Sequence, residues 1–245
     1  MNFKLKIWRQ ADAKAKGGFE TYEVNDISED TSFLEMLDIL NNNLIHEGKE
    51  PVAFDHDCRE GICGMCSLHI NGEAHGPDTE VTTCQLHMRK FHDGDTITIE
   101  PWRSAAFPVI KDLVVERSAF DKIMQAGGFI SVNTGGVPDA NTIPVPRTCR
   151  GELELPLASV AVLRGYLQKR FGHAVRSGPR FVAGQAAAGK VETLRRAKAM
   201  IAKMDELGFG GCTNTRACEA ECPKSISISH IARLNRKFLT AKFKD

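Results

Sequence analysis

The chain has 245 residues, of which 42% are hydrophobic and 26% charged, and its formal net charge is +1 at pH 7. This composition is that of a soluble globular protein with one large domain or two of ordinary size. A charge balance so close to neutral gives no reason to expect nucleic-acid binding, and no apolar run is long enough to span a bilayer. The first residues, MNFKLKIWRQ, lack the apolar stretch of a signal peptide, so we expect a cytoplasmic protein.

The amino-terminal hundred residues carry both strand and helix signals. Periodicity and turn residues predict strands over 3–7, 19–24, 67–70 and 96–100, and one helix ending at residue 45. Thr31 or Ser32 is the expected N-cap of that helix. Its apolar face is formed by Phe33, Met36, Leu37, Leu40 and Leu44. Asn71-Gly72 predicts a hairpin turn, and the whole stretch predicts a small α+β domain.

Beyond residue 101 the pattern becomes mainly helical. Apolar spacing predicts helices over 109–126, 191–207 and 229–243, with Gly127-Gly128 ending the first of them. A loop rich in Gly, Pro and Asn is expected over 131–146. We therefore predict an α+β domain over 1–103 and a mainly helical domain over 104–245.

Eight cysteines are the strongest chemical signal of the chain. In a reducing compartment cysteines are metal ligands or redox groups more often than disulfides. Four of them lie between positions 58 and 84, one lies at 149, and three lie between 212 and 222, which predicts two separate sites.

The first group is contained in the stretch CREGICGMC and its continuation. Cys58, Cys63 and Cys66 follow the spacing Cys-x4-Cys-x2-Cys, and Cys84 comes after seventeen further residues. This is the spacing of plant-type ferredoxins, in which four thiolates bind a 2Fe–2S cluster. Gly61 and Gly64 permit the tight backbone turns that such a loop requires. Ile62 and Met65 are expected to shield the cluster from water.

Other kinds of site fit this spacing less well. Structural zinc usually shows paired Cys-x2-Cys knuckles, and a disulfide framework conflicts with the expected compartment. Rieske centres replace two cysteines by histidines, whereas all four cysteines are present here. We therefore expect the nearby histidines to face solvent or to surround the ligands without binding iron; they are His56, His69, His75, His87 and His92.

The second group has the spacing Cys212-x5-Cys218-x3-Cys222-Pro223, which ends like the cysteine runs of bacterial ferredoxins. Three ligands make an incomplete site, and only Cys149 remains to join them.

With both groups in view, the chain resembles the iron–sulfur subunits of succinate dehydrogenase and fumarate reductase over residues 1–147 and 190–245. The resemblance is carried by CREGICGMC with Cys84, by NTIPVPR, and by GFGGCTNTRACEAECPKSISISHIARLNR. It implies an amino-terminal β-grasp domain that holds 2Fe–2S and a helical ferredoxin domain that holds 4Fe–4S and 3Fe–4S. Cys222 would match a 4Fe–4S ligand, and Cys212 and Cys218 would match two 3Fe–4S ligands.

The segment 148–189 departs from that family. The family carries a C-x2-C-x2-C-x3-C run there, whereas this chain offers only Cys149, so neither helical-domain cluster has all its ligands. No Asp occurs between Asp139 and Asp205 either. One alternative is a divergent member that kept only its first cluster, with orphan thiols in the second domain.

We favour the hypothesis that this segment is translated out of frame. One permitted codon choice for residues 163–176, read one base later, encodes C-V-A-T-C-K-N-G-S-A-M-L-F-V. One choice for residues 155–162, read two bases later, encodes A-A-C-I-G-C-G. Joined across one missing base, they restore C-I-G-C-G-A-C-V-A-T-C, the expected run.

The resemblance implies an electron-transfer subunit of a succinate:quinone oxidoreductase, with roles in electron transport and the tricarboxylic acid cycle. Its partners would be an FAD-containing flavoprotein subunit, a membrane-anchor cytochrome b subunit and a quinone, and it would lie on the inner face of the cytoplasmic membrane. No dinucleotide-binding Gly-x-Gly-x-x-Gly follows a strand, and no catalytic residues for the substrate are expected in this chain. Two alternatives remain open: a 2Fe–2S subunit of another oxidoreductase, and a non-redox zinc or structural module.

Overall fold

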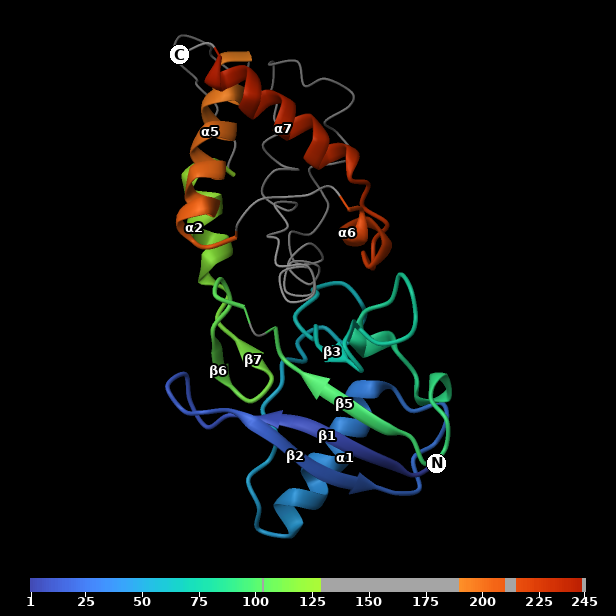
Figure 1. The fold of residues 1–245 in the computed structure, drawn as a ribbon. Helices are drawn as coiled ribbons and strands as arrows, with labels where there is room; N and C mark the ends of the chain where they lie inside the picture. The colour runs from blue at the N-terminus through green and yellow to red at the C-terminus, as the bar shows by residue number, and fades with distance from the viewer. Residues whose placement is uncertain (103, 129–189, 210–214, 244–245) are drawn as a thin grey trace, which may run out of the picture.

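The computed structural model describes residues 1–102, 104–128, 190–209 and 215–243. A twisted sheet with one helix forms one end of the molecule, and a group of helices forms the other (Figure 1). The predicted loop over 131–146, Cys149, Cys212 and the atypical segment 148–189 lie outside the described residues.

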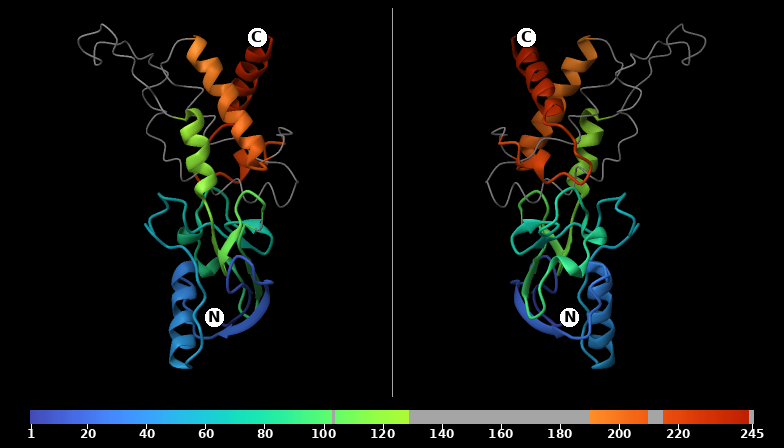
Figure 2. Two further views of the ribbon diagram at one scale, coloured as in Figure 1. Left: turned by 90° about the vertical axis from the view of Figure 1, so that its left-hand side faces the viewer. Right: turned by 90° about the vertical axis from the view of Figure 1, so that its right-hand side faces the viewer.

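The sheet has five strands in the order β2-β1-β5-β3-β4. They are β1 (Phe3–Arg9), β2 (Gly18–Val24), β3 (His69–Ile70), β4 (Glu73–Ala74) and β5 (Thr96–Glu100). The central strands β1 and β5 pair in parallel, and the other neighbours pair antiparallel. Helix α1 (Phe33–His46) packs on one face of this sheet (Figure 2). This is the β-grasp arrangement, so the predicted strands, hairpin and helix are confirmed.

Helix α1 begins where its sequence signals indicate. The Ser32 hydroxyl accepts the Glu35 N–H, and the Glu35 carboxylate accepts the Ser32 N–H, which together form a capping box. The apolar face is buried and consists of Phe33, Leu34, Met36, Leu37, Leu40 and Leu44. Burial of each such side chain contributes about 1.5–3 kcal/mol, so this face attaches the helix to the sheet.

The helix predicted over 109–126 is wrong in its first half. Residues 109–115 form a hairpin of β6 (Val109–Lys111) and β7 (Val114–Val115), and α2 spans only Ser118–Gly127. The cause is Asp112, whose φ of 46° is incompatible with a helix. Its buried carboxylate accepts the backbone N–H groups of Gln10 and Ala53 at 2.9 and 3.0 Å, so contacts with distant residues stabilise the turn.

The helical end is built from α2, α5 (Lys190–Glu206) and α7 (Ser229–Lys242), with the four-residue helix α6 (Ala217–Ala220) before α7. The predicted helices over 191–207 and 229–243 are confirmed. Their shared core contains Ala119, Ile123, Ala197, Met200, Met204, Phe209 and Leu234. None of the described helices is both long enough and apolar enough to cross a lipid bilayer.

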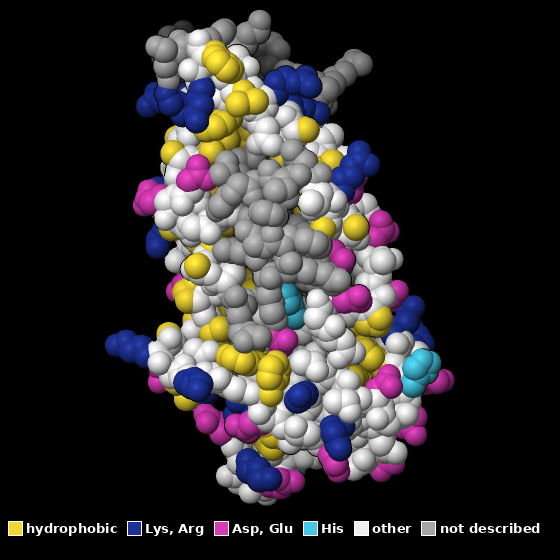
Figure 3. Space-filling model, viewed as in Figure 1, with side chains coloured by type: hydrophobic (Ala, Val, Ile, Leu, Met, Phe, Trp, Pro, Cys, Tyr) yellow, Lys and Arg dark blue, Asp and Glu magenta, His cyan; other side chains and the backbone are white. Residues whose placement is uncertain are grey.

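The two ends of the molecule are connected by the β6–β7 hairpin. Leu113 at its turn is buried in the core of the sheet region, whereas Val109 and Val115 belong to the helical core together with Trp102. A second contact joins β4 to the segment around α6, where Ala74 packs against Cys218 and Cys222. Over the sheet region, basic and acidic side chains are interspersed on the surface (Figure 3).

Candidate metal centre

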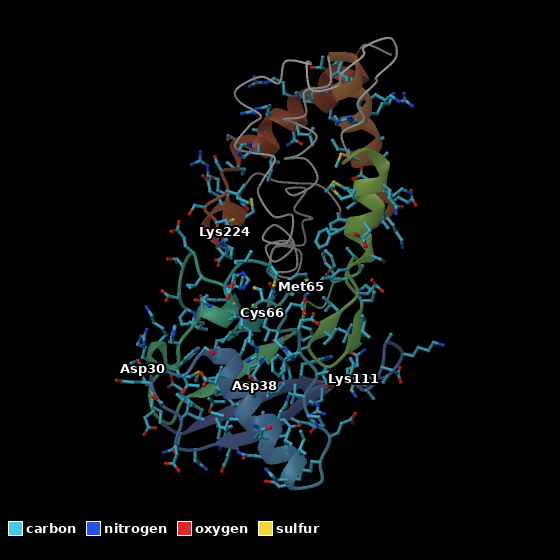
Figure 4. All side chains as sticks on the ribbon, turned by 180° about the vertical axis from the view of Figure 1, so that it is seen from behind. Asp30, Asp38, Met65, Cys66, Lys111 and Lys224 are labelled. Atoms are coloured by element: carbon cyan, nitrogen blue, oxygen red, sulfur yellow. The ribbon has the colours of Figure 1, made fainter. Side chains whose placement is uncertain are left out.

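The four cysteines of the first group meet at the end of the sheet region that faces the helices. Three come from the loop between α1 and β3, and Cys84 comes from a short 3-10 helix over Thr83–Gln85. Cys66 and Cys84 are buried and Cys58 and Cys63 are half-buried. Figure 4 shows Cys66 beside Met65 at this end, whereas Asp38 lies on α1.

Backbone N–H groups of the loop point at the sulfur atoms. Cys58 Sγ accepts three of them, from Glu60, Ile62 and Cys63 at 3.4, 3.4 and 3.3 Å. Cys84 Sγ accepts the Gly61 N–H at 3.2 Å, although the two residues are 23 positions apart. A loop that surrounds sulfur with N–H donors stabilises negative charge there, as iron–sulfur ligation requires.

Positive φ angles make this wrapping possible. Gly61 and Gly64 have φ angles of 69° and 70°, and Arg59 adopts 55°. A Cβ atom on Gly61 would lie 3.1 Å from Gln85 Cγ and 3.3 Å from Thr82 Oγ1, so the position is tight as well as left-handed. The structural reason expected for these two glycines is confirmed.

The thiol groups differ in their protonation. Burial opposes ionisation of Cys58, but the N–H groups of Cys63, Glu60 and Ile62 outweigh it and lower its pKa to about 7. The hydrogen bond from the Cys66 side chain lowers the pKa of Cys84 to about 5, and it raises the pKa of Cys66. Burial raises the pKa of Cys63. The surroundings of Cys58 and Cys84 therefore favour the thiolate, which is the form that binds metal, whereas those of Cys63 and Cys66 favour the thiol.

The candidate ligands at this end of the sheet region are four thiols. In the part of the chain that the structure describes, no three His, Cys, Asp or Glu side chains are arranged to hold one metal ion. Structural zinc requires four ligands around one ion, whereas a 2Fe–2S cluster spreads four thiolates over two irons. Four thiols with inward-pointing N–H donors are the kind of ligand set that a 2Fe–2S cluster takes.

One expectation about the surroundings needs correction. Ile62 is 50% exposed, so its side chain does not shield the site, whereas Met65 is half-buried beside it. Of the nearby histidines, which were expected to face solvent or to surround the ligands, His69 and His75 are buried. His56 and His92 are exposed and His87 is half-buried.

Three residues of the site were missed in the sequence. Thr82 places its hydroxyl 3.2 Å from Cys84 Sγ, and Gln85 Nε2 donates to the Arg59 carbonyl at 2.9 Å. Their proximity to Cys84 in the chain was the available signal. Arg117 also reaches the loop, where it donates to the Met65 carbonyl at 2.8 Å. It is separated from Met65 by 52 positions, and no local pattern marks it.

The second cysteine group is described only in part. Cys218 and Cys222 are buried, and the Ile226 N–H points at Cys222 Sγ at 3.4 Å. The two cysteines pack with Ala74 and Ile231, so they lie next to the sheet region. The Ser225 hydroxyl donates to the Glu80 carboxylate at 2.5 Å and adds a polar contact between the same segments.

The β-grasp fold and its cysteine loop define a plant-type ferredoxin class of iron–sulfur protein. A family profile described as a 2Fe-2S iron-sulfur cluster binding domain matches residues 4–122. The chain is homologous to the iron–sulfur subunits of succinate dehydrogenase and fumarate reductase, which confirms the resemblance and the class of function predicted from the sequence.

Three similar proteins illustrate this relationship. The succinate dehydrogenase iron-sulfur subunit of Bacillus subtilis is 29% identical over 213 residues, which cover 82% of this chain and 78% of that protein. The fumarate reductase iron-sulfur subunit of Wolinella succinogenes is 34% identical over 105 residues, 42% of this chain and 38% of that protein. A chain of the Mycobacterium smegmatis Sdh1 complex in the apo form has the same fold, with a TM-score of 0.60, 23% identity and coverage of 96% and 95%.

Proposed function

We propose that this chain is the electron-transfer subunit of a succinate:quinone oxidoreductase and that Cys58, Cys63, Cys66 and Cys84 hold its 2Fe–2S cluster. The observation that supports this most directly is the convergence of four thiols with inward N–H donors, above all the Gly61 N–H on Cys84 Sγ at 3.2 Å. When bound, a 2Fe–2S cluster accepts and releases one electron at a time. The chain's own contribution is to orient the thiolates and to bury Cys66 and Cys84.

The partners follow from the same proposal. A flavoprotein subunit with FAD would exchange electrons with succinate or fumarate, and a membrane-anchor cytochrome b subunit would present the quinone. This places the chain on the inner face of the cytoplasmic membrane, between the two. The domain division at residue 103 belongs to the proposal too. Ile99 lies in the core of the sheet region and Trp102 in the helical core, although Leu113 returns to the sheet core and the matched profile continues to residue 122.

The helical region would hold the 4Fe–4S and 3Fe–4S clusters if its missing cysteines were restored. Both flanks of the atypical segment pack into one core, since Ile123 before it and Met200 after it share the same buried cluster. Mutually packed flanks support the hypothesis that both flanks are in the native reading frame and that only residues near 148–189 are shifted. In that case Cys222 would serve 4Fe–4S, and Cys212 and Cys218 would serve 3Fe–4S.

Metal analysis of the purified full chain tests the function. After anaerobic reconstitution, we expect two irons and two sulfides per chain and the EPR signal of a reduced 2Fe–2S cluster. Stoichiometric zinc in a colourless protein would instead support the structural module. A cluster in a chain that fails to stimulate electron transfer from a succinate dehydrogenase flavoprotein to a quinone analogue would support a subunit of another oxidoreductase.

Sequencing the gene tests the frameshift directly. We expect one missing base between the codons for residues 155 and 176, and restoring it should raise the iron content well above two per chain. A gene whose codons do not encode C-I-G-C-G-A-C-V-A-T-C in the shifted frames would eliminate the hypothesis and leave a divergent one-cluster member.

A further inference from the structure

We infer that Arg117 is a positioning residue that holds the 2Fe–2S loop from the helical side and raises the reduction potential of that site. The inference rests on the proposed cluster, and it concerns a residue that lies far from the four cysteines in the sequence. Arg117 occupies the N-cap position of α2, directly after the β6–β7 hairpin.

The guanidinium group of Arg117 contacts three residues. It donates to the Met65 carbonyl at 2.8 Å, and a second nitrogen lies 2.7 Å from the Met65 sulfur. It forms an ion pair with Asp55 at 3.1 Å and stacks over the Trp102 ring at 4.8 Å. Met65 stands between Cys63 and Cys66, so these contacts restrain the part of the loop that carries two ligands.

Burial makes the charge of Arg117 effective at short range. Its side chain is only 13% exposed and Asp55 is 24% exposed. Burial lowers the pKa of Arg117, whereas Asp55, Cys66, Asp57 and Cys63 act in the opposite direction. An arginine stays protonated at such a site. Charges in a poorly solvated environment interact more strongly than they do in water and are less screened by salt.

A cation at the position of Arg117 favours reduction of a cluster held by the loop. Reduction adds one negative charge within the ring of thiolates, and nearby charges and hydrogen bonds are among the factors that set the potentials of iron–sulfur sites. Arg117 stabilises the added charge, and Asp55 opposes it. The ion pair between Arg59 of the loop and Asp38 of α1 has side chains that are 42% and 36% exposed, so solvent screens it far more.

Redox titration of the reconstituted full chain with dithionite, monitored by the EPR signal, tests the inference. Arg117→Gln should lower the midpoint potential, Asp55→Asn should raise it, and Arg117→Lys should retain most of the wild-type value because it keeps the charge. Both shifts should persist at high salt. Arg89→Gln, which breaks an exposed pair with Asp30, should leave the potential unchanged.

Opposite shifts in Arg117→Gln and Asp55→Asn would not arise from a merely structural role. Unchanged potentials, shifts in the same direction, or loss of the cluster from both variants would overturn the inference. These outcomes leave the proposed function intact, since that proposal fails only if the wild-type chain itself assembles no cluster.

Discussion

The carboxylate of Asp112 accepts the backbone N–H of Ala53 at 3.0 Å, across 59 positions of the chain. The same carboxylate also accepts from Gln10 N–H at 2.9 Å and pairs with Arg9 at 3.1 Å. The turn of the β6–β7 hairpin is therefore attached both to the end of β1 and to the segment that leads into the cysteine loop.

Removal of this carboxylate should destabilise the whole protein. Asp112→Ala leaves two half-buried N–H groups and the Arg9 Nε–H without their acceptor, and we expect a loss of about 3 kcal/mol in the free energy of unfolding. Urea denaturation monitored by circular dichroism measures it. The neighbouring Lys111→Ala breaks only an exposed pair with Glu50 and should leave the urea midpoint unchanged. Equal effects of the two changes would refute this role.

Substitution of the remote ligand should abolish the first cluster. In Cys84→Ser the hydroxyl is a poorer iron ligand than a thiolate, so we expect loss of the 2Fe–2S visible absorbance and EPR signal after reconstitution. The matched variant Cys218→Ser changes a buried cysteine of the second group and should keep that signal. A fully assembled cluster in Cys84→Ser would show that another residue supplies the fourth ligand.

Two glycines with the same backbone conformation should respond differently to alanine. Gly48 and Gly61 have φ angles of 70° and 69°, but a Cβ on Gly48 meets nothing within 4 Å. Each substitution carries a backbone penalty of about 1 kcal/mol. Only in Gly61→Ala would the added Cβ also clash with Gln85 and Thr82. We therefore expect Gly61→Ala, but not Gly48→Ala, to reduce the cluster content per chain. Iron and sulfide analysis compares them, and equal content in both variants would argue against a tight loop.

The buried His75 should make stability depend on pH. Burial, followed by the neighbouring His69, lowers the pKa of His75 to about 3. In the unfolded chain His75 therefore takes up a proton near pH 6.5, whereas in the folded chain it does not. The stability that neutral His75 contributes to the folded protein is complete above pH 6.5 and is lost as the pH falls toward 3. Between pH 7.5 and 5.5 the free energy of unfolding should fall by about 1.4 kcal/mol.

Denaturant titrations at the two pH values measure this loss. His75→Gln should remove it, whereas His92→Gln, at an exposed position, should retain it. An identical pH dependence in wild type and His75→Gln would mean that His75 does not titrate as its burial requires.

Local signals predicted most of the first domain. The N-cap of the helix, expected at Thr31 or Ser32 and found at Ser32, the Asn71-Gly72 turn and the strand over Thr96–Glu100 depend on contacts within a few residues, and each is present. The prediction over 109–117 was wrong because apolar spacing there fits a helix as well as a hairpin. The contacts of Asp112 with Gln10 and Ala53, which decide between the two, connect residues 102 and 59 positions apart.

The spacing of Cys58, Cys63, Cys66 and Cys84 was sufficient by itself to predict the kind of site, because four soft ligands at those intervals are typical of one cluster type. Only the tertiary structure decided what surrounds the site: the Gly61 N–H on Cys84, the burial of His69 and His75, and the approach of Arg117 to Met65. The physical reason is that ligand identity is a property of local residue order, whereas charge, burial and hydrogen bonding at the site come from segments that meet only after folding.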